Sequence, residues 1–127
     1  MDNSLLIDKV INYYNNSDDV SAYNKTILDV FNKLNIRLGE LVDLKLNDYD
    51  ESNHTFNIKS SKGILIQHSI DDDTAKQLDY YIHNIRNKWN INNLDNLFIN
   101  RFGKELSDAY VSIMIKMIFN KIRKKEI

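Results

Sequence analysis

The chain has 127 residues, of which 43% are hydrophobic, so it is long enough to bury one core. It contains no cysteine, which excludes disulfides and cysteine-ligated metal sites. Its formal net charge of -1 and its pI near 6.3 differ from those of a dedicated duplex-binding protein, which is usually basic. Any binding to phosphate would therefore depend on a local basic face.

No apolar run reaches the roughly 18 residues that a membrane span needs, and the first residues lack the basic start of a signal peptide. We therefore expect a soluble, cytoplasmic protein with no membrane partner. The sequence also has no Gly/Ser-rich or Pro-rich linker and no internal repeat. This predicts a single domain over residues 1–127.

Three helical patterns occupy the first part of the chain. After a cap at Ser4, one helical face holds Leu5, Leu6, Val10, Ile11 and Tyr14. Residues 17–19, Ser-Asp-Asp, begin a second helix, whose buried stripe we expect to be Tyr23, Ile27, Phe31 and Leu34. A short third helix is predicted from Arg37 to Leu44, with Leu41 and Leu44 inward.

After a turn-rich run at residues 47–53, the apolar pattern changes from helical to alternating. Two strands are predicted, one with Phe56 and Ile58 and the next with Ile64 and Ile66. Residues 60–63, Ser-Ser-Lys-Gly, predict a hairpin in which Gly63 supplies a positive φ.

The clearest helix begins at the acidic run 71–73, which suits a helix N-terminus. Its apolar residues alternate between spacings of three and four: Ala75, Leu78, Ile82, Ile85 and Trp89. Residues 96–99 predict a short apolar strand, and residues 101–104 a turn. Ser107 and Asp108 cap a final helix with Val111, Met114, Ile115, Ile118 and Ile122 inward. These elements predict an α+β fold, mostly helical, with a small three-stranded antiparallel sheet.

The order of these segments, and the motif at residues 35–41, resemble the front half of the catalytic domain of tyrosine recombinases, the phage integrase family. That family carries its first arginine in a motif like Gly-Leu-Arg-x-x-Glu-Leu, and residues 35–41 match it from Arg37 onward. The resemblance implies that Arg37 stabilises negative charge on a phosphate, with Glu40 bracing its surroundings. Asn35 stands where the family tends to have glycine, and this departure questions the tightness of the preceding turn more than the role of Arg37. From the residues alone, Arg37 and Glu40 also suit an ordinary i,i+3 ion pair.

Lys62 matches the family's hairpin lysine, which acts there as a general acid beside the scissile phosphate. Lys59 is an alternative for this position, and hairpin lysines are also common simply because turns are exposed. The family usually continues with further basic residues and a proline, whereas residues 64–70 read Ile-Leu-Ile-Gln-His-Ser-Ile.

The segment 97–107 resembles the strand, glycine turn and helix cap that follow in the family. Beyond it, the family has a His-x-x-Arg segment and a nucleophilic tyrosine, and no match follows Ile122. We therefore expect a truncated integrase-like catalytic domain that does not cleave DNA. His83 and Arg86 have the His-x-x-Arg spacing, but they lie within the clearest helix, so we expect both to be exposed and remote from the site. None of the seven tyrosines is assigned as nucleophile.

Three functions remain open. The first is a non-catalytic protein from a phage or other mobile element that binds DNA or regulates recombination or lysogeny. The second is a fragment of an active recombinase. The third is a modulator that binds a full-length recombinase-like partner or a second copy of itself. The resemblance places it in a bacterial host cell or nucleoid. The DNA-binding candidates are Arg37, Lys59, Lys62, Arg101 and Lys104, and the basic tail at residues 121–125 is either part of this face or a solvated helix end.

No cofactor or metal is expected, since a helix start explains the acids at residues 71–73. For the partner hypothesis, the resemblance implies that the last helix lacks its usual cover near Val111, Ile115 and Ile118. Exposed apolar surface of that kind tends to bind a partner.

Overall fold

The computed structural model describes residues 18–60 and 62–126, apart from the side chains of Ile118 and residues 121–126. The helices are α2 (Asp19–Leu34), α3 (Leu38–Asp43), α4 (Asp72–Tyr80), α5 (Asn87–Trp89) and α6 (Asp108–Glu126), together with the 3-10 turn η1 (Leu46–Asp48) and the π-helical segment η2 (Tyr81–Arg86). The strands are β1 (Tyr49–Asp50), β2 (Thr55–Lys59) and β3 (Leu65–Ser69). The predicted helix at residues 4–14 lies outside the described residues. No helix within the described range is long and apolar enough to cross a membrane.

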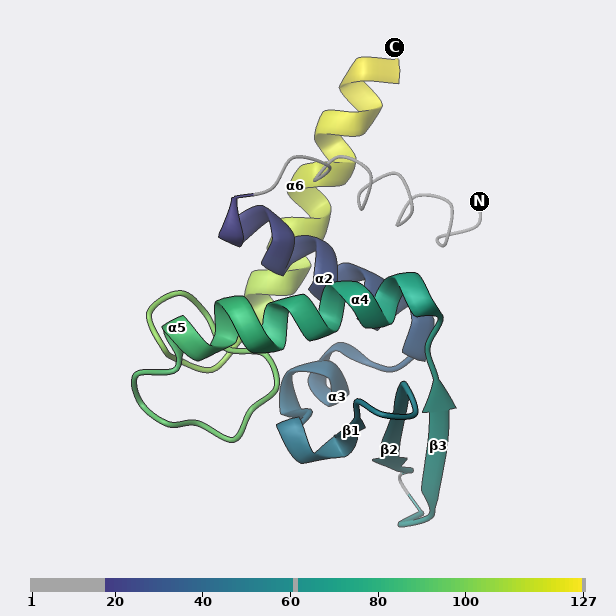
Figure 1. The fold of residues 1–127 in the computed structure, drawn as a ribbon. Helices are drawn as coiled ribbons and strands as arrows, with labels where there is room; N and C mark the ends of the chain where they lie inside the picture. The colour runs from purple at the N-terminus through teal and green to yellow at the C-terminus, as the bar shows by residue number, and fades with distance from the viewer. Residues whose placement is uncertain (1–17, 61, 127) are drawn as a thin grey trace.

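The three strands form one antiparallel sheet in the order β1-β2-β3, which confirms the predicted fold class (Figure 1). The first strand was not predicted, because it falls within the turn-rich run at residues 47–53. Tyr49 pairs with Phe56 across the sheet, and their rings lie 4.8 Å apart. A strand of two residues is too short to show an alternating pattern, so only this pairing reveals it.

The predicted strand at residues 96–99 is wrong. This segment makes two isolated bridges, Lys45 with Asn96 and Ile99 with Glu105, and joins no sheet. Side chains from η2 take up its backbone groups instead. The hydroxyl of Tyr81 donates to the Leu97 carbonyl at 2.8 Å and accepts from the Ile99 N–H at 3.1 Å.

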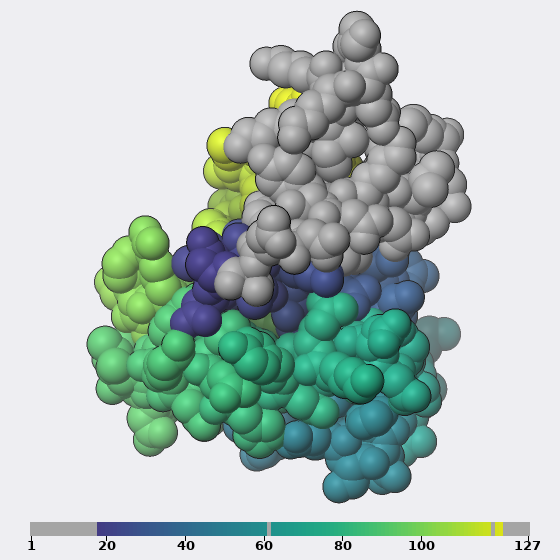
Figure 2. Space-filling view, turned by 45° about the horizontal axis from the view of Figure 1, so that its top comes forward, coloured from purple at the N-terminus to yellow at the C-terminus, as the bar shows by residue number. Residues whose placement is uncertain are grey.

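The helical core forms where α2 packs against α4 and η2 (Figures 1 and 2). Asp18 caps α2, and its carboxylate accepts from the Ser21 N–H at 2.7 Å. In the two predicted stripes, Phe31 and Trp89 are partly buried. The other residues are buried: Tyr23, Ile27, Leu34, Ala75, Leu78, Ile82 and Ile85. These apolar patterns were therefore sufficient to predict the main helical interface.

The last helix, α6, begins where the Ser107 hydroxyl accepts from the Tyr110 N–H at 3.1 Å. Val111 is fully buried and Ile115 is partly buried, so the prediction that Val111 lacks cover is wrong. The exposed apolar side chains are Ile113 and Met117, at 57% and 55% exposure. These exposed side chains lie two positions along α6 from Val111 and Ile115, and so on the opposite side of the helix from the predicted surface.

Candidate nucleic-acid interface

A residue in the left-handed backbone conformation, Asn35, ends α2 two positions before Arg37. Asn35 has φ 52° and ψ 44°, and its N–H donates to the Phe31 carbonyl at 3.2 Å. Asparagine adopts this conformation more readily than most other residues, and at helix ends it is second only to glycine in this role. Asn35 therefore permits the sharp exit from α2 without the glycine, and the chain reaches Arg37 in an extended conformation.

Glu40 braces the backbone of Arg37. Its Oε1 accepts from the Arg37 N–H at 3.0 Å, as an acid in the first turn of a helix often does. Within the described residues, Glu40 makes this bond rather than an ion pair with the guanidinium. The Arg37 side chain is left exposed to solvent at the start of α3.

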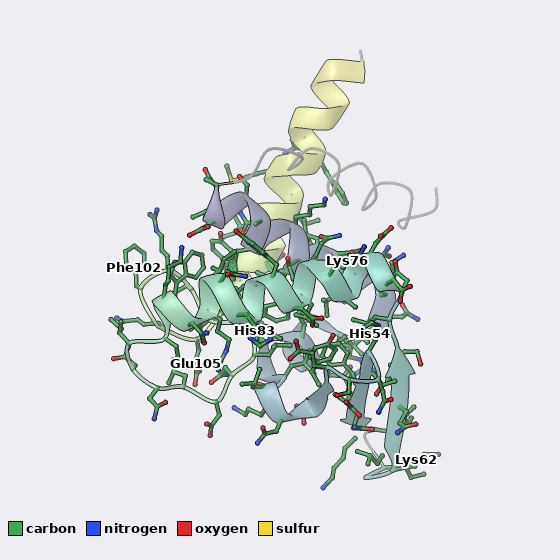
Figure 3. All side chains as sticks on the ribbon, viewed as in Figure 1. His54, Lys62, Lys76, His83, Phe102 and Glu105 are labelled. Atoms are coloured by element: carbon green, nitrogen blue, oxygen red, sulfur yellow. The ribbon has the colours of Figure 1, made fainter. Side chains whose placement is uncertain are left out.

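The β2–β3 hairpin is closed by Ser60. Its N–H donates to the Ile64 carbonyl at 2.8 Å, and its hydroxyl accepts from the N–H groups of Lys62 and Ile64, both at 3.3 Å. Gly63 has the predicted positive φ, 78°. Lys62 is exposed at the tip of the hairpin (Figure 3).

The start of α3 and the two hairpin strands enclose a concavity of about 480 Å³. It is lined by Asn35, Ile36, Arg37, Glu40, Ile58, Lys59, Ser60, Ile66 and His68. Two of the predicted cations, Arg37 and Lys59, thus share one surface, whereas Lys62 lies beyond it at the hairpin tip. His68 was missed as a candidate, although its place two residues after Ile66 predicts the same face of β3.

A second concavity, of about 320 Å³, lies beside the first and shares Glu40, Ile58 and Lys59 with it. It also carries Asp43 and Asp48. Because like charges repel, these acids disfavour phosphate there. The charge distribution therefore favours the side that bears Arg37.

Arg101 and Lys104 lie in the loop before α6, at the other end of the molecule. Figure 3 shows Phe102 of this loop and Lys62 on opposite sides. The Arg101 guanidinium sits 4.9 Å from the centre of the Phe102 ring. The five predicted cations therefore form two separate groups.

The two residues of the His-x-x-Arg pair in η2 have different surroundings. His83 is exposed, as predicted, and lies 2.7 Å from the Glu51 carboxylate. The prediction that Arg86 is exposed is wrong, because it is only 6% exposed and its guanidinium donates to the carbonyls of Leu94, Asn96 and Leu97. In the part of the chain that the structure describes, no cluster of three His, Asp or Glu residues suits a metal ion.

No protein-family model matches the chain. Tyrosine recombinase XerC from two strains of Lactobacillus delbrueckii subsp. bulgaricus is 26% identical over 119 residues, which cover 91% of this chain and 40% of XerC. Among solved structures, XerA recombinase matches with a TM-score of 0.75 and 21% identity, over 91% of this chain and 40% of XerA. XerH site-specific recombinase, bound to its palindromic difH substrate in a post-cleavage complex, matches with a TM-score of 0.74 and 22% identity, over 92% of this chain and 33% of XerH.

The chain is therefore homologous to part of tyrosine recombinase XerC and has the fold of part of XerA and XerH. It spans about 40% of the length of the curated relatives that it matches. The predicted resemblance to part of a tyrosine recombinase is confirmed, in sequence by XerC and in fold by XerA and XerH.

Proposed function

We propose that this recombinase-related domain binds the backbone of duplex DNA through the Arg37 concavity, the surface lined by Arg37, Lys59 and His68. The observation that carries the proposal is that Arg37, which the motif at residues 35–41 matches to the recombinase arginine, shares this concavity with Lys59 of the hairpin. A guanidinium and an ammonium on one concave surface suit phosphate oxygens. Lys62 extends the same surface toward the tip of the hairpin.

The charge of the concavity supports backbone contact rather than base reading. Arg37 and Lys59 contribute two positive charges, and Glu40 contributes one negative charge whose carboxylate is held by the Arg37 N–H. Contacts to phosphate position a protein on DNA but carry no sequence information directly. We therefore expect weak binding with little sequence preference from this surface alone.

As part of the same proposal, the 127-residue chain acts as one domain in regulating DNA recombination, as a phage or mobile-element protein, without cutting strands. Among the described residues, the one His-x-x-Arg segment holds its arginine inside the fold, against backbone carbonyls. Transition-state stabilisation in strand cleavage needs donors aimed at the phosphate. Arg86 is only 6% exposed, so its guanidinium is not presented to a phosphate at the surface.

The test is a titration of a labelled random duplex with the 127-residue chain, followed by fluorescence anisotropy at several salt concentrations. Each phosphate contact contributes about 0.9 to the slope of log K against log salt. We expect Arg37→Ala with Lys59→Ala to weaken binding about 10-fold and to reduce the slope by about 2. The pair Arg37→Ala with Lys62→Ala shows whether the tip lysine contributes equally.

The matched control is Lys76→Ala with Lys116→Ala, which removes the same charge from exposed positions on α4 and α6. This control should retain most of the affinity and the slope. Equal losses in both double variants would mean that net charge, and not the Arg37 concavity, governs binding, and the proposed interface would be abandoned.

A second function, association with itself or with a larger recombinase-like protein, is favoured by one observation. Ile113 and Met117 are exposed one turn apart on α6, and Tyr110 is exposed at the start of the same stripe. A stripe at spacings of three and four is the form in which helices bind apolar partners. This candidate is compatible with DNA binding, because α6 does not contribute to the Arg37 concavity.

A further inference from the structure

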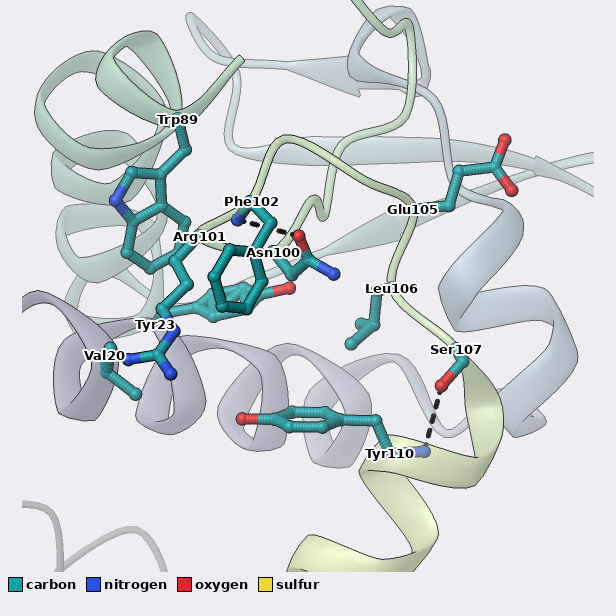
Figure 4. A pocket seen from close by; sticks show the side chains of 10 residues that line it. All are labelled: Val20, Tyr23, Trp89, Asn100, Arg101, Phe102, Glu105, Leu106, Ser107 and Tyr110. Atoms are coloured by element: carbon teal, nitrogen blue, oxygen red, sulfur yellow. Dashed lines mark hydrogen bonds between the residues drawn. The ribbon is translucent and has the colours of Figure 1, made fainter. Parts of the chain in front are cut away.

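A pocket of about 350 Å³ lies between the start of α2, the end of α5 and the loop that leads into α6 (Figure 4). It is lined by Val20, Tyr23, Trp89, Asn100, Arg101, Phe102, Glu105, Leu106, Ser107 and Tyr110. The pocket shares no residue with the Arg37 concavity. Its volume falls in the range of about 300–1,000 Å³ that is typical of small-molecule sites.

Four aromatic side chains form most of the wall. Tyr23 and Trp89 meet edge to face with their ring centres 5.1 Å apart, while Phe102 and Tyr110 come from the loop and from α6. Figure 4 shows the Tyr110 ring below the pocket and the Trp89 and Phe102 rings above it. Walls of this kind favour a flat, apolar ligand that stacks against them.

The Tyr23 hydroxyl is the strongest sign that the pocket takes a ligand. Tyr23 is only 3% exposed, and its hydroxyl is buried with no hydrogen-bond partner among the described residues. Figure 4 shows this hydroxyl pointing among the lining residues, toward Leu106. A buried hydroxyl without a partner is costly, so native structures rarely contain one without a reason.

The other polar groups of the pocket also offer donors. Asn100 accepts with its Oδ1 from the N–H groups of Phe102 and Lys104, at 2.9 and 3.0 Å, which leaves its Nδ2 as a free donor in the described structure. The Arg101 guanidinium contributes a positive charge at the edge, whereas the Glu105 carboxylate points away from the other side chains (Figure 4). A complementary ligand must therefore present acceptors.

We propose that this pocket, the Tyr23 pocket, binds a small planar aromatic anion. Its ring stacks on Trp89 and Phe102, its anionic group pairs with Arg101, and an acceptor atom receives the hydrogen bond of Tyr23. A free aromatic carboxylate and a nucleoside monophosphate share this chemistry. The experiment below separates these two sources.

Trp89 is the only tryptophan of the chain, so its fluorescence reports directly on the Tyr23 pocket. The 127-residue chain is titrated with phenylacetate and, separately, with adenosine monophosphate. We expect saturable quenching with a Kd of about 1 mM, as befits a ligand of few atoms. Phenylacetamide and acetate, which lack the charge and the ring respectively, should bind about 10-fold more weakly.

Tyr23→Phe should lower the affinity for the ligand but raise the stability of the free protein. It should weaken binding of the better probe about 10-fold, because a hydrogen bond is lost. It should also raise the Tm of the free protein by about 3 °C, because a buried hydroxyl without a partner is removed. The matched control, Tyr80→Phe, alters an exposed tyrosine outside the pocket and should change neither value.

Arg101→Gln should weaken binding about 10-fold, whereas Lys104→Gln, on the same loop but outside the lining, should not. Arg37→Ala should leave it unchanged, which separates this site from the DNA interface. Stronger binding of either probe supports the proposal and identifies its source. Absence of saturable quenching with both probes, or equal affinity for phenylacetate and phenylacetamide, would overturn it, as would unchanged affinity in Tyr23→Phe.

Discussion

Replacing Arg86 with Met tests whether this arginine is structural or part of a phosphate site. Its Nε donates to the carbonyls of Asn96 at 3.1 Å and Leu97 at 3.2 Å, and one of its terminal nitrogens donates to Leu94 and Asn96, both at 2.8 Å. Methionine has a similar unbranched stem but no donor. The variant therefore removes these hydrogen bonds while it retains most of the apolar packing.

The cost follows from what each carbonyl retains. The Leu97 carbonyl still accepts from the Tyr81 hydroxyl, and the Leu94 carbonyl still accepts from the Asn90 side chain. The Asn96 carbonyl keeps no donor among the described residues. One orphaned carbonyl costs about 1–3 kcal/mol, and a lost hydrogen bond to a charged group about 1.5–3 kcal/mol. We expect the free energy of unfolding to fall by about 3–5 kcal/mol, a large share of the stability of a small domain.

The assay is urea unfolding followed by circular dichroism, with Lys76→Met as a control that removes an exposed cation outside both proposed sites. DNA binding is measured on the same samples under conditions in which the variant is folded. A change in unfolding free energy below about 1 kcal/mol, together with lost DNA binding, would refute the structural role and would restore His83-x-x-Arg86 as a phosphate site.

Three other results are expected. Burial raises the pKa of Asp29 above its ordinary value of 3.8, so the protonated carboxyl contributes stability below that value, and this contribution is lost as the pH rises through the raised pKa. The free energy of unfolding of Asp29→Asn should therefore be about 1 kcal/mol higher than that of the wild type near neutral pH and equal to it in acid. A difference in urea unfolding that does not change with pH would contradict this. The 127-residue chain should form no SDS-resistant adduct with a nicked suicide substrate, because the described lining of the Arg37 concavity holds neither a second arginine nor a tyrosine nucleophile. A covalent adduct would contradict this expectation. Ile113→Glu with Met117→Glu should lower any self-association seen by light scattering, whereas Lys116→Glu should not, and a wild type that is monomeric at all concentrations would count against the partner hypothesis.

The helical core was predictable because its pattern is local. Ala75, Leu78, Ile82 and Ile85 recur at helical spacing, and all are buried in the structure. The hairpin was predictable for the same reason, since Gly63 and the flanking alternation lie within a few residues. Such features depend on near neighbours in the sequence, and the fold retains them.

The features that were missed depend on contacts between distant segments. Arg86 is buried because the loop at residues 94–97 places its carbonyls around the guanidinium, and nothing in the helical pattern of residues 75–89 indicates this loop. β1 exists because Tyr49 meets Phe56 and because its hydroxyl donates to Asp79, 30 residues further on. The sequence alone gives no periodic signal for either arrangement.

The near-neutral net charge does not conflict with a DNA-binding surface, because screening makes binding depend on nearby charges. At about 0.1 M salt, a phosphate interacts mainly with groups within about 10 Å. In the described structure, Glu40 and Lys59 line both concavities, whereas Arg37 lines only one and Asp43 and Asp48 line only its neighbour. The total charge therefore conceals a local difference in sign. If the proposed interface is right, we expect duplex DNA to approach with its backbone toward the Arg37 side and away from the acidic side.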